Sequence, residues 1–200
     1  MNKLPTLLLL AGSAAAIGSA GANDLVLRAG IHNVDPKSDN NAVVHVDSNA
    51  TLSLAGEWYF NKNLALDVLG ALPFKHDVRL NADNSKVASV KHLPPTISLQ
   101  YHFNPAGAFD PYVGVGVNYT MFFDKQTKGA LAGTKLTLKN SFGPAVQLGG
   151  DFAIGKDWLI GVDVRYIKIK GEAKVNGASI GDVTVDPLVY GVAIGKRFSL

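Results

Sequence analysis

The chain has 200 residues, of which 47% are hydrophobic and 18% are charged, and its formal net charge is +3. This length fits a single folded domain, and the apolar content argues against disorder. The Lys and Arg residues form no basic cluster, which argues against nucleic acid as a partner. Because the sequence has no Cys, it excludes disulfides, thiolate metal sites and Cys nucleophiles.

Residues 1–22 have the pattern of a secretory signal peptide. Lys3 supplies the positive charge, an apolar stretch extends to Ile17, and Ala20 and Ala22 are the small residues that a signal peptidase needs. The strongly apolar part is shorter than the ~20 residues that a transmembrane helix requires. We therefore expect cleavage after Ala22 and export of residues 23–200 as one domain.

After this segment, apolar residues alternate with polar or small ones in eight segments. The apolar positions run through residues 25–31, 52–60, 64–72, 97–103, 113–123, 142–152, 158–166 and 188–200. Alternation with a period of two indicates β-strands with one apolar face. The connections are alternately short and long, and the long ones cover residues 35–47, 75–91, 124–135 and 170–186. This pattern predicts an all-β fold, an eight-stranded antiparallel up-and-down transmembrane β-barrel of the bacterial outer membrane.

A soluble lipocalin-type barrel has the same period, so the chemistry of the two faces must decide between them. The charged face also carries glycines such as Gly114 and Gly161, which is typical of a cramped interior. The apolar face ends in aromatic residues, which we expect to form two belts: Trp58, Phe60, Tyr101, Phe103, Phe152, Trp158 and Phe198 near the short turns, and Phe74, Phe123, Phe142 and Tyr166 near the long loops. Two such belts favour the membrane barrel, with lipids and lipopolysaccharide around it.

Charged residues on the inward face are predicted to block the lower lumen. They are Arg28, Glu57, Asp67, Asp151, Asp163, Arg165 and Arg197. The interior of an eight-stranded barrel is only wide enough for side chains or one small ligand, which excludes a wide aqueous pore. Because buried ions persist only with partners, we expect these charges to pair with one another and form a polar plug.

The inward face beneath the long loops is apolar instead. Its residues include Leu69, Phe122, Ile167, Ile169 and Val189, which suit the capture of a small hydrophobic molecule. A captured molecule cannot leave through the plug, so its exit must lie at the side.

Prolines near the same end suggest where this exit lies. Pro73, Pro94, Pro95 and Pro144 each remove a donor from the strand ladder, and we expect the first three to frame a lateral opening. In the alternative interpretation, the prolines only end strands and the apolar residues only pack.

Short stretches spread over nearly the whole exported chain carry a family resemblance. They are residues 27–30, 34–36, 72–77, 92–101, 111–114, 118–123, 158–167 and 185–187. In these stretches the chain resembles the outer membrane protein W (OmpW) family, which includes alkane-uptake proteins. The family typically ends in Phe, whereas this chain ends in Ser199 and Leu200. The resemblance implies passive, lateral uptake of small hydrophobic solutes, and we expect no enzymatic activity and no cofactor.

His32, His76 and His92 are candidates to meet near the long loops, where hydrogen bonding is favoured over metal binding because no ligand spacing is present. We therefore expect no metal site.

Three function classes remain open. The first is a channel for small hydrophobic molecules, and the second is a narrow channel for polar solutes or ions. The third is a stress-related barrel without transport, or a receptor whose loops bind phage or protein toxins. In each case the outer-membrane assembly machinery is a further expected partner.

Overall fold

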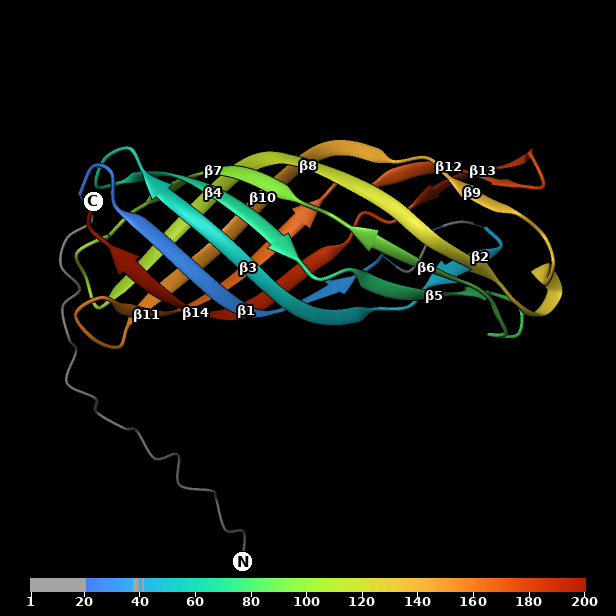
Figure 1. The fold of residues 1–200 in the computed structure, drawn as a ribbon, viewed down its shortest axis with the longest axis horizontal. Coiled ribbons are helices and arrows are strands. Elements are labelled where there is room, and N and C mark those ends of the chain that lie inside the picture. Colours follow the sequence, from blue (N-terminus) through green and yellow to red (C-terminus); the bar gives the residue numbers. More distant parts are fainter. Residues whose placement is uncertain (1–20, 38–39, 41) are drawn as a thin grey trace, which may run out of the picture.

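Eight long strands close into one barrel in the computed structural model, which describes residues 21–37, 40 and 42–200 (Figure 1). These strands are β1 (Leu25–Asp35), β3 (Asn49–Tyr59), β4 (Leu64–Ala71), β7 (Thr96–His102), β8 (Phe109–Thr127), β10 (Ser141–Ala153), β11 (Trp158–Ile167) and β14 (Leu188–Phe198). Every neighbouring pair is antiparallel, and the pairings of β1 with β14 and of β8 with β10 complete the ring. The predicted barrel is confirmed, while residues 1–20 of the expected signal peptide lie outside the described part.

The two faces of the barrel are divided as the alternation predicts. Outward side chains are apolar and exposed, for example Leu54 (68% exposed) and Leu148 (65% exposed). Inward side chains include charged residues that are almost fully buried, such as Glu57 and Asp67. An apolar exterior around a charged interior suits a lipid environment, where all backbone groups must be paired within the closed ring. In the described residues, no helix is long and apolar enough to cross a membrane.

Exposed aromatic residues lie at both ends of the apolar band, as predicted for all the aromatic positions except Phe74. Trp58 and Trp158 are exposed near the short turns, and Phe142 is exposed at the opposite end. The prediction for Phe74 was wrong, because its side chain is only 2% exposed and belongs to an internal core. Leu72 and Pro73 are both exposed, so the alternation slips by one residue at Pro73 and turns Phe74 inward.

The long connections are folded, whereas the sequence predicted loops. They contain β2 (Val44–Val46), β5 (Phe74–Leu80), β6 (Lys86–Leu93), β9 (Leu136–Leu138), β12 (Lys170–Val175), β13 (Ala178–Thr184) and the short 3-10 helix η1 (Gly129–Leu131). The β5–β6 hairpin continues β4 and β7, and β6 pairs with the far end of β8. We call these elements the extracellular extension, since long connections of outer-membrane barrels face outward; it lies on the right in Figure 1.

A tight turn helps to order this extension. Asn176 and Gly177 both have positive φ and join β12 to β13, as a two-residue hairpin turn requires.

At Gly116, strand β8 lies so close to β7 that there is no room for a side chain. A Cβ at this position would lie 2.7 Å from the Cα of Ser98 on β7 and still closer to the carbonyl oxygen of Ile97. At Gly56 on β3 the nearest atom would be Leu27 Cδ2, at 3.8 Å. We expect Gly116→Ala to lower the free energy of unfolding by about 1–3 kcal/mol through overpacking, and Gly56→Ala to change it little. Urea unfolding in lipid vesicles measures both, and equal stability of the two variants would contradict the strand spacing.

Candidate functional site

The lower layer of the lumen is built around Arg28 on β1. Its guanidinium donates to both carboxylate oxygens of Asp151 on β10, at 2.6 and 2.7 Å. It also donates to Glu57 on β3, through Nε at 3.0 Å and through Nη2. Such forked contacts are the strongest geometry for an Arg–carboxylate pair. One cation therefore joins three strands inside the barrel.

His102 on β7 extends this lower layer. Its Nε2 lies 2.8 Å from Glu57 Oε1, and its Nδ1 lies 2.8 Å from Asp110 Oδ2. Arg197 lies above the ring of Tyr59, with its guanidinium carbon 5.5 Å from the ring centroid. All these side chains are at least nine-tenths buried. The layer thus closes the periplasmic half of the lumen.

A second charged layer crosses the barrel nearer its middle. Arg165 on β11 donates from Nη1 to Asp67 on β4 at 2.9 Å, and from Nε to Asp163 at 2.7 Å. The strands β11 and β4 lie opposite each other in the ring. His32 contacts Asp163 at 2.9 Å and Ser53 at 2.7 Å. Because one pair spans the full width of the lumen, this layer obstructs vertical passage as well.

One group in the lower layer has the composition of a metal site. His102, Asp110 and Asp151 each bring one ligand atom within 4.8 Å of the others. Their polar atoms are already engaged, however: Asp151 holds Arg28, while His102 contacts Glu57 and Asp110. The group fits a self-paired polar layer better than a site for a cation.

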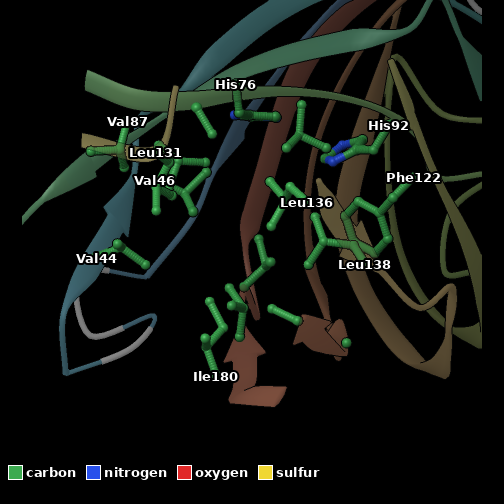
Figure 2. Close-up of a pocket in the computed structure, with 17 residues that line it drawn as sticks. Val44, Val46, His76, Val87, His92, Phe122, Leu131, Leu136, Leu138 and Ile180 are labelled. Carbon is green, nitrogen blue, oxygen red and sulfur yellow. The ribbon is translucent and has the colours of Figure 1, made fainter. Parts of the chain in front are cut away.

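Above the charges, apolar residues fill the lumen. The predicted residues Leu69, Ile167, Ile169 and Val189 are all buried, and the last three pack with Phe74 and Val185. Leu69, Ile167 and Val189 line a small cavity of about 10 Å³. The fifth predicted residue, Phe122, lies higher and lines a larger cavity of about 70 Å³ in the extracellular extension. Figure 2 shows this larger cavity among valine, leucine and isoleucine side chains.

The three predicted prolines lie together at a gap in strand pairing. Pairing between β4 and β7 ends at Leu69 and Thr96, and pairing between β5 and β6 begins at Phe74 and His92. Residues 70–73, which end in Pro73, and residues 93–95, which contain Pro94 and Pro95, lie between these two stretches. We call this gap the seam. Between residues 70–73 and the neighbouring strand β3 the wall is intact, since the backbone N–H of Leu72 donates to the carbonyl of Leu52 in a 2.9 Å hydrogen bond.

The wall is thin at the seam. Gly70 and Ala71 line the small internal cavity, which Pro94 and Thr96 also line. The same two residues line a groove on the outer face of the barrel, together with Leu52 and other residues of β1 and β3. Gly70 and Ala71 therefore border both spaces, although the outer groove lies over the paired strands β1, β3 and β4 and not over the gap itself.

Asn118 on β8 stabilises the seam, and the sequence analysis assigned it no role. Its side-chain nitrogen donates to the carbonyls of Pro94 at 3.0 Å and Pro95 at 3.1 Å, and to Thr96 Oγ1 at 3.0 Å. Its oxygen accepts from Thr120 Oγ1 at 2.6 Å. Buried carbonyls need partners, and the Asn118 side chain adds one at Pro94 and a second one at Pro95, whose carbonyl also accepts from the backbone N–H of Tyr119 at 3.1 Å. The sequence showed only a polar Asn118 on the inward face of its strand, and its proximity to Pro94 and Pro95 comes from the fold.

Together, the lipid-facing exterior, the closed ring and the self-paired interior define an eight-stranded outer-membrane β-barrel without an open aqueous pore. The family model described as "OmpW family" matches residues 20–198, and the chain belongs to this family. As a member it is an outer-membrane protein in contact with lipid and lipopolysaccharide, and it is not an enzyme.

Individual relatives agree with this assignment. The chain is 37% identical to Outer membrane protein W of Escherichia coli over 203 residues, covering 95% of this chain and 94% of the relative. It is 35% identical to Outer membrane protein AlkL of Ectopseudomonas oleovorans, over 79% of this chain and 70% of the relative. The crystal structure of OprG from Pseudomonas aeruginosa superposes with a TM-score of 0.81 at 32% identity, covering 92% of this chain and 100% of OprG. The predicted family membership and outer-membrane location are confirmed.

Proposed function

We propose that the protein admits small hydrophobic molecules passively across the outer membrane and releases them sideways into the bilayer at the seam. The observation that carries this proposal is the unpaired seam, whose β4 edge, at Gly70 and Ala71, lines an internal cavity and borders an outer groove over the neighbouring strands β1 and β3. A molecule driven only by its concentration gradient needs an apolar path and an exit, and the seam supplies the exit.

The path above the seam is lined mainly by apolar side chains. The larger cavity of the extracellular extension includes Val185 and Phe122, and the cavity at the seam includes Phe74 and Ile167. These residues belong to, or pack against, one core cluster between the two cavities. Passage therefore requires rotamer changes of apolar side chains, and no charge has to lose its water along this route.

The charges favour this route over the second candidate, a channel for polar solutes or ions. Arg165 and Asp67 cross the barrel from opposite strands, and Arg28 holds two carboxylates in the layer below. A polar solute moving down the lumen would have to break both layers, and a buried ion pair that loses one partner costs several kcal/mol.

Proline replacement at the seam tests the lateral exit. Pro73→Ala, and separately the double variant Pro94→Ala with Pro95→Ala, restore backbone N–H groups that can pair across the gap. A restored hydrogen bond contributes about 1 kcal/mol, so we expect uptake of toluene to fall by roughly fivefold for each one formed. Uptake is measured in cells with lipopolysaccharide-bearing outer membranes, at equal amounts of folded barrel judged by the mobility of unheated samples in gels.

Pro144→Ala is the matched control. Pro144 lies in β10, away from the seam, where it pairs with Val117 of β8. Toluene uptake by this variant is expected to equal that of the wild type. Unchanged uptake in well-folded Pro73→Ala and Pro94→Ala/Pro95→Ala barrels would rule out the seam as the exit.

A further inference from the structure

The large cavity in the extracellular extension contains two polar groups in otherwise apolar surroundings. Its volume is about 70 Å³, and its lining is formed by aliphatic and aromatic side chains apart from His76 on β5 and His92 on β6. Both imidazoles lie along the same edge of the cavity (Figure 2). Their ring centroids are 4.7 Å apart, and each residue is only 3% exposed. The third candidate histidine, His32, lies elsewhere and is engaged with Asp163 and Ser53.

One nitrogen of each ring is buried without a partner among the described residues. These atoms are His76 Nε2 and His92 Nε2. Leaving a buried polar atom unpaired costs about 1–3 kcal/mol, so two such atoms side by side need an explanation. Both residues line the cavity, but their Nε2 atoms have almost no accessible surface there, so a bound molecule reaches them after a rotation of the rings.

The hydrogen-bonding roles of the two rings follow from their surroundings. The Nδ1 of His76 lies 2.5 Å from the backbone carbonyl of Asp47, which can only accept, so Nδ1 carries the proton. Burial lowers the pKa of His76 below its ordinary value, and burial together with the neighbouring His76 lowers the pKa of His92 to about 3. Both rings are therefore neutral at pH 7. In this state His76 Nε2 is an acceptor, and His92 Nε2 donates or accepts according to its tautomer.

A hydroxyl group is the ligand group that matches this pair, because it donates one hydrogen bond and also accepts. We propose that the cavity binds a small apolar molecule with one hydroxyl group, an alcohol or a phenol, which donates to His76 Nε2 and bonds to His92 Nε2. The inference rests on the proposed uptake function and narrows its substrate class. The cavity, at about 70 Å³, is larger than the ~10–15 Å³ that one water needs but about half of the ~150 Å³ that admits benzene, so an aromatic guest enters by displacing apolar side chains of the lining. Phe74 and Phe122 border the two rings and supply apolar contact.

Phenol and toluene test this proposal, because they have the same shape and differ by a hydroxyl in place of a methyl group. The mature chain, folded in lipid nanodiscs and labelled at its histidine nitrogens and its Leu and Ile methyl groups, is titrated with each compound. Methyl signals of Leu138 and Ile180, which line the cavity, report occupancy by either compound. We expect phenol to bind about tenfold or more tightly than toluene, after subtraction of partition into empty nanodiscs, since each hydrogen bond contributes about 1 kcal/mol. Only phenol should shift the Nε2 resonances of His76 and His92.

Two variants and a control locate the effect. His92→Phe removes no hydrogen bond to another described residue, so the fold should persist while the preference for phenol falls by roughly fivefold. His76→Phe should lower the preference to a similar degree. His45→Phe is the matched control, because His45 bonds to Asn81 in the same extension and is not part of the cavity lining. This control should keep the full preference.

The outcomes separate this proposal from the uptake function. Equal binding of phenol and toluene, or a phenol preference that survives both His76→Phe and His92→Phe, would overturn the hydroxyl site and leave the lateral exit standing. Absence of binding by either compound would overturn the site as well. Failure of the uptake function appears in a different experiment, as toluene uptake by cells that does not exceed that of cells lacking the protein.

Discussion

Arg28→Met is expected to lower the free energy of unfolding by about 3–5 kcal/mol, the largest stability effect of any single substitution considered for this barrel. The substitution leaves Glu57 and Asp151 buried, with their forked partner removed. Met keeps the aliphatic part of the Arg side chain but lacks the guanidinium, so two buried carboxylates lose their shared cation: Asp151 loses its ion-pair partner, and Glu57 keeps only His102. Urea unfolding in lipid vesicles, followed by tryptophan fluorescence and by the mobility of unheated samples, measures the change.

Two further variants test whether the loss of stability comes from unpaired buried charge. Arg79→Met removes an ion pair with a single contact, Nε at 2.7 Å from Asp47, between side chains that are 30% and 37% exposed, and we expect little change there. Adding Glu57→Gln and Asp151→Asn to Arg28→Met neutralises the stranded charges and should recover much of the lost stability. A triple variant that is as unstable as Arg28→Met would show that the plug acts through packing and not through charge pairing.

The barrel itself could be predicted from the sequence because two physical constraints act on every strand. A membrane barrel must place apolar side chains outward at every second position, and its strands must alternate between short and long connections. Both constraints produce a regular pattern of apolar residues and of connection lengths in the sequence. The positions of Glu57, Asp67 and Arg165 inside the lumen follow from the same alternation, without knowledge of any contact.

The partners of these charges could not be predicted in the same way. Arg165 meets Asp67 across 98 positions of sequence, and only closure of the ring brings β11 opposite β4. Phe74 was predicted to face outward, but the alternation shifts by one residue at Pro73 and Phe74 faces inward. A strict period of two along the sequence cannot predict such a shift. The extension was missed because its strands are short and pair with each other, so their side chains do not follow the lipid-facing pattern.

The seam depends both on the sequence pattern and on contacts that only the folded barrel brings together. Prolines remove the donors of the ladder, as the sequence indicates, but the structure adds Asn118, whose amide binds the carbonyls of Pro94 and Pro95. The carbonyls of Pro94 and Pro95 therefore have partners without any pairing across the gap. In the function proposed above, the charged layers and the gap act together, because a solute that meets paired charges at the bottom of the lumen is directed to the side wall.

Ala71→Phe is expected to reduce toluene uptake by about tenfold or more, which corresponds to an added barrier of ~1.4 kcal/mol or higher. Ala71 lines the internal cavity at the seam and borders the outer groove, so a phenyl group there would obstruct the exit proposed above. The rate of uptake is measured at equal amounts of folded barrel, since overpacking also costs stability.

Ala55→Phe is the control that separates a lateral path from a vertical one. Ala55 lies on β3 opposite Leu69, one layer below the pairing of Ser53 with Ala71, and it lines a cavity among Arg28, Asp67 and Arg165. Its cavity, about 10 Å³, is the same size as the one at Ala71, so the two substitutions overpack the lumen to a similar degree. A molecule that leaves at the seam never reaches Ala55, and Ala55→Phe should keep wild-type uptake. If both variants lose uptake equally, the solute travels down through the charged layers, and the polar channel becomes the better description of the lumen.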